Sequence, residues 1–260
     1  MTPSDVKIVI PVYRNTLNKF EQLSLRRCLN VLREYPIVIV KPESLYFSYL
    51  TNLYPQCTVE TFSDDYFTSI VAYNRLMLNT EFYERFTNVK YILIYQLDAY
   101  VFADKLVQWV NKGYDYIGAP WLLKKKYHRW YYQLFLRLKT LSYKLQGKPF
   151  NTTIVGDKVG NGGLSLRKVA SHIQILRKKA EKAHYFLQQS KRFASFNEDV
   201  FWATQSTFRY PDYKEATLFS IESQPELAYE YTGGKNPFGC HGWSKERNLP
   251  FWRTKIDIDE

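Results

Sequence analysis

The sequence has few cysteines and no long apolar run, and both shortages exclude classes of protein. Its 260 residues include three cysteines, Cys28, Cys57 and Cys240, which are far apart and odd in number. They show neither a disulfide framework nor zinc-binding spacing, and a reducing compartment is the simplest interpretation. No window reaches about 18 consecutive apolar residues, so no membrane-spanning helix is predicted. The start, Met1 to Asp5, lacks the basic residues and the apolar stretch of a signal peptide.

Several motifs of nucleotide, zinc and serine enzymes are also missing. The sequence contains no GxxxxGK[ST], no HExxH, no CxxC pair and no GxSxG. P-loop nucleotidases, zinc enzymes and hydrolases of these types therefore lose most of their support. The glycine-rich stretch from Gly160 to Gly163 does not fit GxGxxG and does not follow the first predicted strand.

The composition is that of a globular protein with an uneven charge. Hydrophobic residues make up 45% and charged residues 23%, which excludes a disordered, collagen-like or coiled-coil chain. The net charge of +11 is concentrated in two segments. Residues 124–148 contain eight Lys or Arg and no acid, and residues 167–192 contain eight and one acid, Glu181. Such segments predict an anionic partner: a lipid surface, a nucleic acid or a phosphorylated substrate.

Alternating apolar runs and helical patterns predict an α/β fold. Short apolar runs at 6–12, 36–40, 57–62, 91–95 and 115–120 are typical of strands, and helical spacing extends over about 23–34, 69–86 and 169–189. This alternation predicts a mixed, mostly parallel central sheet flanked by helices, as in Rossmann-like domains. We predict a single domain over residues 1–260, with a basic helical insertion at about 121–150 and a loop-rich region from 196 onward.

Four groups of residues are candidates for chemistry. Asp98 follows the strand at 91–95, where α/β sheets bind ligands; it could hold Mg²⁺ or Mn²⁺, or cap the next helix. The paired glycines of 161–167 suit a close approach to a ligand or a tight turn. In 197–199 (NED), a carboxylate could act as a general base or mark a helix N-terminus. His241 could complete a metal site or lie solvated in a loop.

Taken in order along the chain, these blocks resemble the GT-A fold glycosyltransferases, which use nucleotide sugars. Residues 8–14 look like the first nucleotide-binding strand and loop, and residues 91–102 (YILIYQLDAYVF) resemble the strand with the metal-binding DxD motif. Residues 161–167 with 197–199 are similar to the GG…ED arrangement of inverting galactosyltransferase-type enzymes, and 238–243 (FGCHGW) look like the late histidine segment. The closest likeness is to a little-characterised bacterial group with QxD, NGGLSLR, NED and HGW motifs. The resemblance spans about residues 6–245.

The resemblance implies an inverting, metal-assisted sugar transfer. The expected donor is a UDP-sugar, and the acceptor is a saccharide or lipid-linked saccharide of bacterial polysaccharide biosynthesis, such as O-antigen or capsule. Asp98 and His241 would hold Mn²⁺ or Mg²⁺ against the leaving diphosphate. Asp199 would deprotonate the acceptor hydroxyl, and Glu198 would position the acceptor.

The resemblance also implies the residues that bind donor and acceptor. A nucleotide-binding half would span about 1–120, and an acceptor and catalytic half about 151–260. Gln96 replaces the first Asp of DxD, which lowers the charge at the site but keeps a hydrogen-bonding amide. Asp115 would contact sugar hydroxyls or form a structural turn. The implied donor- and acceptor-binding residues are Pro11, Tyr13, Arg14, Gln96, Asp98, Asn161, Gly162, Gly163 and Trp243.

The basic insertion has an interpretation of its own. Apolar residues follow helical spacing on one face, and basic residues lie elsewhere. This suits a helix on an anionic membrane, and equally a helix docked on its own domain or on a partner subunit. Together with a lipid-linked acceptor, it predicts a cytoplasmic protein that is peripheral at the inner face of the membrane. The apolar residues are Trp130, Leu134, Leu138, Leu141 and Leu145, and the basic ones Arg129, Arg137, Lys139 and Lys144.

Three other functions stay open. A nucleotidyltransferase shares the architecture, but it normally has a glycine-rich, basic loop where this chain has residues 11–15 (PVYRN). A nucleic-acid-binding module would use the two basic segments, although the acids at 98 and 197–199 would repel phosphate. A sugar-binding protein without activity is compatible with Gln96.

Overall fold

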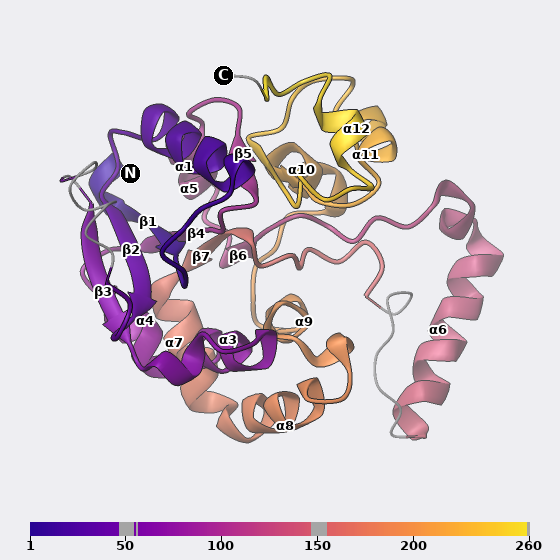
Figure 1. The fold of residues 1–260 in the computed structure, drawn as a ribbon. Coiled ribbons are helices and arrows are strands. Elements are labelled where there is room, and N and C mark those ends of the chain that lie inside the picture. The colour runs from indigo at the N-terminus through magenta and orange to yellow at the C-terminus, as the bar shows by residue number, and fades with distance from the viewer. Residues whose placement is uncertain (47–54, 56, 147–154, 259–260) are drawn as a thin grey trace.

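A mixed β-sheet forms the centre of the molecule (Figure 1). The computed structural model describes residues 1–46, 55, 57–146 and 155–258. Within these residues the main sheet has six strands in the order β3-β2-β1-β4-β7-β6. β1 to β4 are parallel, and β7 is antiparallel to β4 and β6, which confirms the predicted mixed, mostly parallel sheet. The strands are β1 (Val6–Pro11), β2 (Ile37–Pro42), β3 (Thr58–Phe62), β4 (Tyr91–Tyr95), β6 (Tyr116–Ile117) and β7 (Leu164–Lys168).

The inner strands form where the sequence has short runs of branched apolar residues. All five residues of β4 are buried, and valine and isoleucine suit such a pleated, buried position. A strand that is buried on both faces needs helices on both sides of the sheet. Figure 1 shows α1 (Lys19–Val31) and α5 (Leu106–Asn111) on one face, and α4 (Thr80–Glu84) and α7 (Val169–Lys178) on the other.

Two predicted helices are each divided in two by a local break. The helix expected over 69–86 is α3 (Ile70–Met77) followed by α4, because Asn79 caps a new helix through the Glu81 N–H. The helix expected over 169–189 is α7 followed by α8 (Ala180–Ser190), with Lys179 at φ −124° between them. Apolar periodicity continues across both breaks, so it does not reveal them.

The region after residue 196, expected to be loop-rich, also contains short helices and strands that the sequence did not predict. This region contains short helices and the strands β8 (Ser220–Ile221) and β9 (Gly239–His241), which form a second sheet with β5 (Ala99–Val101) in the order β5-β9-β8. Its elements are only two to seven residues long, too short for a periodic signal. The helices are α9 (Glu198–Ala203), α10 (Tyr213–Phe219), α11 (Pro225–Tyr231) and α12 (Leu249–Trp252).

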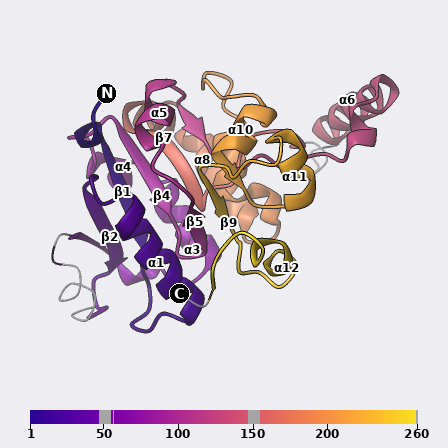
Figure 2. The same cartoon turned by 90° about the horizontal axis from the view of Figure 1, so that it is seen from above.

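Helix α6 (Trp130–Leu145) occupies much of the segment expected to be a basic helical insertion. It stands to one side of the α/β body in both views (Figures 1 and 2). Residues 147–150 of that segment, and 151–154 of the expected acceptor half, lie outside the described residues. In the part of the chain that the structure describes, no helix has both the length and the hydropathy needed to cross a bilayer. Short 3₁₀ helices complete the fold at Pro3–Asp5, Asp64–Tyr66, Lys125–His128 and Ala194–Phe196.

Candidate functional site

A cleft of about 720 Å³ opens at one edge of the main sheet. The segments after β1 and β4 and the segment before β7 all line it. They share this edge because β7 is antiparallel: Tyr95 at the end of β4 pairs with Leu164 at the start of β7. The structure thus brings together most of the residues expected from the sequence, namely Pro11, Tyr13, Arg14, Gln96, Asp98, Asn161, Gly162, Gly163, Glu198, Asp199 and His241.

At one end of the cleft, His241 meets Asp98 and Gln96. Its Nε2 atom lies 2.8 Å from Asp98 Oδ1 and 3.2 Å from Gln96 Oε1. The small sheet creates this cluster, since β5 pairs with β9 and places His241 opposite Ala99, the residue after Asp98. The Gly242 N–H also donates to the Asp98 carbonyl at 2.9 Å.

Sequence reasoning missed two residues next to this cluster, Glu222 and Lys245. Glu222 directly follows β8, whose parallel pairing with β9 brings Glu222 Oε1 to 3.6 Å from His241 Nδ1. Lys245 Nζ lies 3.3 Å from the same carboxylate oxygen, and Lys245 lines the cleft. Lys245 lies four residues after His241, so a search for cations after that histidine could have found it. Glu222 has no local sequence signal.

The charges in this cluster support one another. Burial disfavours a charged imidazole, but the carboxylates of Asp98 and Glu222 outweigh burial and raise the pKa of His241 to about 9. Burial alone would also raise the pKa of Asp98 and Glu222, yet His241 and Lys245 bring both below their usual range. Without a cation, the cluster at neutral pH is therefore an imidazolium between two carboxylates.

The donor atoms of this cluster fit a divalent cation such as Mg²⁺ or Mn²⁺. Adjacent ligands of an octahedral ion with bonds of about 2.1 Å lie about 3 Å apart, close to the 2.8 and 3.2 Å found around His241 Nε2. His241 Nδ1 is buried without a hydrogen-bond partner, and Glu222 lies behind it, where metal-binding histidines usually face a carboxylate. In the described residues no group of three or more His, Cys, Asp or Glu is arranged for a metal. The third donor atom beside His241 Nε2 is the amide oxygen of Gln96.

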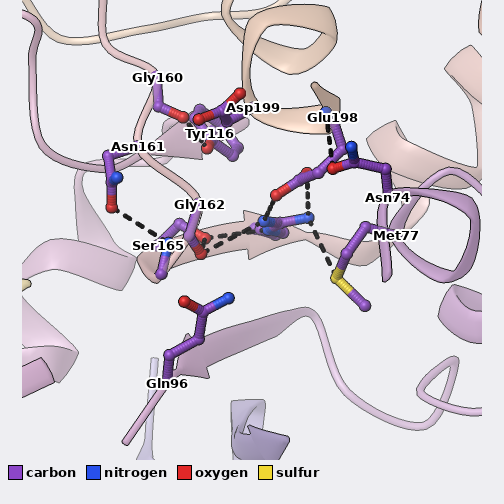
Figure 3. Close-up of polar contacts among 12 residues, drawn as sticks. Asn74, Met77, Gln96, Tyr116, Gly160, Asn161, Gly162, Ser165, Glu198 and Asp199 are labelled. Carbon is purple, nitrogen blue, oxygen red and sulfur yellow. Dashed lines mark hydrogen bonds and ion pairs between the residues drawn. The ribbon is translucent and has the colours of Figure 1, made fainter. Parts of the chain in front are cut away.

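Beneath the cleft, a buried ion pair joins β7 to α9 (Figure 3). Arg167 Nη1 and Nη2 donate to the two carboxylate oxygens of Glu198 at 3.1 and 3.0 Å. Both side chains are almost fully buried, at 0% and 6% exposure. Arg167 also donates to Tyr83 and Ser165, so its charge is well satisfied. Glu198 lines the cleft, and both of its carboxylate oxygens accept hydrogen bonds from Arg167. It therefore forms part of the cleft floor.

A pair of asparagines holds the start of α9. Asn197 is the N-cap residue, and its Oδ1 accepts a hydrogen bond from Asn74 Nδ2 at 2.9 Å. Asn74 Oδ1 in turn accepts from the Glu198 N–H at 3.2 Å. The NED segment is thus a helix N-terminus and a wall of the cleft at the same time. Of the two interpretations of its acids, the helix N-terminus is observed, and the general base stays a prediction.

Asp199 faces the cleft with a perturbed carboxyl group. Its Oδ1 accepts from the Val200 N–H at 2.7 Å. Burial, the adjacent Glu198 charge and Glu222 raise the pKa of Asp199 to about 8, against smaller opposing effects of the Val200 N–H and Arg167. Asp199 is therefore largely protonated at neutral pH and becomes a base under mildly alkaline conditions. A carboxyl group with such a pKa in a cleft is typical of proton-transfer sites.

The paired glycines make room for two side chains of the site. A Cβ atom on Gly163 would lie 2.0 Å from His241 Nε2, and one on Gly162 would lie 2.2 Å from Glu198 Oε1. Neither glycine has a positive φ, so the requirement is space and not backbone conformation. The Gly163 carbonyl also accepts from the Gln96 N–H at 2.8 Å. The two glycines thus serve the packing of His241 and Glu198 within the cleft wall.

The structure places two candidate residues away from the cleft. The Trp243 ring is fully buried in the second core, and its Nε1 donates to Ser24 Oγ at 3.0 Å. Trp243 was therefore misassigned as a ligand-binding residue, because an aromatic ring beside a site residue can equally be core. Asp115 accepts hydrogen bonds from the Ser171 hydroxyl and the Arg209 N–H at 2.6 and 2.8 Å. Of its two interpretations, the structural turn is the one observed.

Comparisons with known proteins agree on the fold. A family model described as "Protein of unknown function (DUF5672)" matches residues 56–241. No curated protein matches the sequence. The structure is similar to the galactosyltransferase LgtC in complex with donor and acceptor sugar analogs (12% identity, TM-score 0.53, 96% of this chain and 100% of that chain). It is also similar to the bifunctional glycosyltransferase WbbM (14%, 0.54, 94% and 46%) and to mouse xyloside xylosyltransferase 1 (11%, 0.50, 90% and 96%). The likeness shows that the fold is GT-A.

The buried ion pair should make Glu198 important for stability. We expect Glu198→Gln to lower the free energy of unfolding by about 3–5 kcal/mol, because Arg167 would stay buried without its counter-charge. Glu84→Gln is the matched control, since Glu84 pairs with the exposed Arg177 at 2.7 Å and should cost less than about 1 kcal/mol. Urea unfolding measures both. Equal losses in the two variants would contradict a structural role for the buried pair.

The raised pKa of Asp199 should make stability depend on pH. Between the ordinary pKa of 3.8 and about 8, the folded protein holds a proton on Asp199 that the unfolded chain has lost, so the free energy of unfolding falls as pH rises. Asp199→Asn removes this cost. One pKa unit corresponds to about 1.4 kcal/mol and 1 kcal/mol to about 2–4 °C. We therefore expect the Tm of the variant to lie several degrees above that of the wild type at pH 8. Near pH 4 the Tm of the variant should not exceed that of the wild type. A gap that does not change with pH would refute this.

Proposed function

The chain belongs to the family DUF5672, and we propose that it is a GT-A glycosyltransferase that moves a sugar from a nucleotide-sugar donor to a saccharide acceptor. The observation that carries this proposal is the set of side chains that line one cleft. At one end of the cleft the Asp98 carboxylate, the Gln96 amide and the His241 imidazole meet. Asp199, whose carboxyl group has a pKa of about 8, lines the same cleft. This combination suits a diphosphate leaving group and a hydroxyl nucleophile. The GT-A fold supports it.

We assign donor binding to the part of the cleft formed by residues from about 1–120. Pro11 ends β1 at the cleft, and Tyr13 and Arg14 follow it. The Tyr13 ring is exposed there, which suits stacking on a nucleobase. We propose a UDP-sugar as the donor. Lys245 adds a cation beside Glu222 that could face the diphosphate. A divalent cation held by Asp98, His241 and Gln96 would supply the charge that stabilises the leaving nucleoside diphosphate.

We assign the acceptor and the proton transfer to the second half, from about residue 151 onward. Asn161, Gly162 and Gly163 line the cleft and would face the sugars. Asp199 would take the proton of the acceptor hydroxyl. The hydroxyl oxygen would then bond to the anomeric carbon of the donor sugar, while the bond from that carbon to the diphosphate oxygen breaks. In-line attack would invert the anomeric configuration. Both carboxylate oxygens of Glu198 are already bonded to Arg167. Glu198 would therefore keep α9, and with it Asp199, in position.

The acceptor we propose is a saccharide, free or attached to a lipid carrier, in the synthesis of a bacterial polysaccharide such as O-antigen or capsule. The enzyme would then work at the inner face of the cytoplasmic membrane. The two basic segments support an acceptor of this kind because a carrier phosphate is anionic. The acids at the cleft make nucleic acid the less suitable partner, since they would repel its backbone.

Nucleotide binding tests the proposal directly. We expect one member of a panel of UDP, GDP, CMP and dTDP compounds to raise the Tm in the presence of Mn²⁺. A ligand at about 100 times its Kd adds about 2.7 kcal/mol, which corresponds to a shift of about 5–10 °C. Asp98→Asn and His241→Ala should abolish the dependence on Mn²⁺. Asp104→Asn, which changes a carboxylate bonded to Tyr35 outside the cleft, should keep it. No shift with any nucleotide would overturn the proposal.

Asp199→Asn should lower the rate of transfer by at least about 100-fold, because it removes the base. The thermal shift with the nucleotide should stay the same, since Asp199 does not bind the donor in this proposal. In the wild type, kcat/KM should rise about tenfold per pH unit below pH 8 and then level off, following the ionised fraction of Asp199. NMR of the product should show an inverted anomeric centre. Retained configuration, or full activity in the variant, would exclude Asp199 as the base.

A further inference from the structure

Helix α6 has an apolar face that the described residues leave uncovered. Seven large apolar side chains on it are each between 42% and 80% exposed. Among its apolar residues, Leu136 is buried. A water-soluble surface rarely gathers so many large apolar side chains in one place, and such a patch marks an interaction site. The seven are Trp130, Tyr131, Leu134, Phe135, Leu138, Leu141 and Leu145.

Helix geometry gathers these side chains into one continuous surface. At about 100° per residue, the seven fall within an arc of about 140°, and Leu136 points to the opposite side. Arg137 and Lys139 border the arc on its two sides, and Arg137 is exposed. An apolar face with cations along its edges is the pattern of helices that lie in a membrane surface, where the cations reach the headgroups.

The charge around α6 points to an anionic surface. Residues 124–148 contain eight Lys or Arg and no acid. Trp130 and Tyr131 lie at the start of the helix, and such rings prefer the boundary between headgroups and hydrocarbon. A protein partner for an apolar face with this charge would have to be acidic at its rim. A bilayer with anionic lipids meets both requirements without a specific complement.

The charge around the face argues against a second copy of the chain as its partner. Residues 124–148 contain eight Lys or Arg and no acid, so a second copy would bring like charges to the rim of the same face. A bilayer with anionic lipids brings the opposite charge, and the apolar side chains gain free energy individually as they enter it.

A paired stem connects α6 to the cleft. The chain leaves the body and returns side by side: the Trp121 N–H donates to the Lys158 carbonyl at 3.0 Å, and the Asp157 N–H donates to the Trp121 carbonyl at 2.7 Å. Asp157 also bonds to His128 Nε2 at 2.6 Å and accepts from the Leu123 N–H at 2.9 Å. The returning strand reaches the cleft residue Asn161, whose N–H donates to Ala119. The stem therefore ends at the acceptor side of the cleft.

We propose that α6 binds the surface of an anionic lipid bilayer through this apolar face and its basic border. The lipid surface would bring the acceptor side of the cleft next to a membrane-held acceptor, and this purpose rests on the proposed function. The binding of α6 to the bilayer does not rest on the proposed function, because it involves α6 alone.

Vesicle sedimentation tests the proposal. The full chain is mixed with vesicles of phosphatidylcholine alone, or of phosphatidylcholine with phosphatidylglycerol. We expect binding to the anionic vesicles, weakened at least tenfold when ionic strength rises from about 0.1 M to about 0.5 M. Leu134→Asp/Leu138→Asp should weaken binding by about 100-fold, or about tenfold per leucine. Leu218→Asp changes an exposed leucine of α10 and should leave binding unchanged.

A second pair of variants separates the basic border from overall charge. Arg137→Glu/Lys139→Glu and Lys178→Glu/Arg192→Glu change the net charge equally, but the second pair lies in the other basic segment. Only the first should weaken binding to anionic vesicles, by at least about tenfold. Equal losses in both would show attraction by net charge alone and overturn the role of α6.

Two further outcomes would also overturn the proposal. One is absence of binding to either vesicle type. The other is self-association in analytical ultracentrifugation that Leu134→Asp/Leu138→Asp removes, without vesicle binding, which would make the occupant a second copy. The nucleotide-dependent Tm shift is measured on the same variants and should not change, since α6 lies outside the cleft. Vesicle binding without any nucleotide shift would leave this proposal standing while the transferase proposal fails.

Discussion

The buried ion pair between Arg167 and Glu198 connects the sheet to the reactive side of the cleft. Arg167 comes from β7 and Glu198 begins α9, so the pair fixes α9 against the sheet at the point where Asp199 enters the cleft. Burial is the main cause of the raised pKa of Asp199, and the charge of the same glutamate adds to it. The ion pair therefore sets the position of Asp199 and contributes to its basicity. A pair removed from water in this way is costly unless fully hydrogen-bonded, and Tyr83 and Ser165 complete the bonding of Arg167.

The sequence predicted the parallel strands β1, β2 and β4 because each is a short run of mainly large apolar residues. Asp98 was found because it follows such a strand, where α/β sheets bind ligands, and Asn161 was found because paired glycines follow it. The strand β7 was missed, because its sequence LSLRK alternates apolar with polar and basic residues and is too short to stand out. Because β7 is antiparallel and starts at this edge, the residues before it reach the cleft, as the residues after a parallel strand do.

The second sheet and its consequences could not be predicted. β8 and β9 have two and three residues, too few for a pattern. The pairing of β9 with β5 places His241 beside Asp98, and the pairing of β8 with β9 brings Glu222 to His241. Trp243 shows the opposite error. In an extended segment, residues two apart face the same side. Gly242 has a φ of 60° and ends the extended segment, so His241 lines the cleft while Trp243 lies in the core.

The small sheet also determines when the site can form during synthesis. All six strands of the main sheet precede residue 169, whereas β8 and β9 come much later in the chain. A nascent chain therefore has all six strands of the central sheet before Glu222, His241 and Lys245 are made. Phe219 and Phe238, which come just before β8 and β9, belong to the core of the main sheet. The last part of the chain therefore completes the main core and the cluster around His241 together, and a chain that stops before it would lack both.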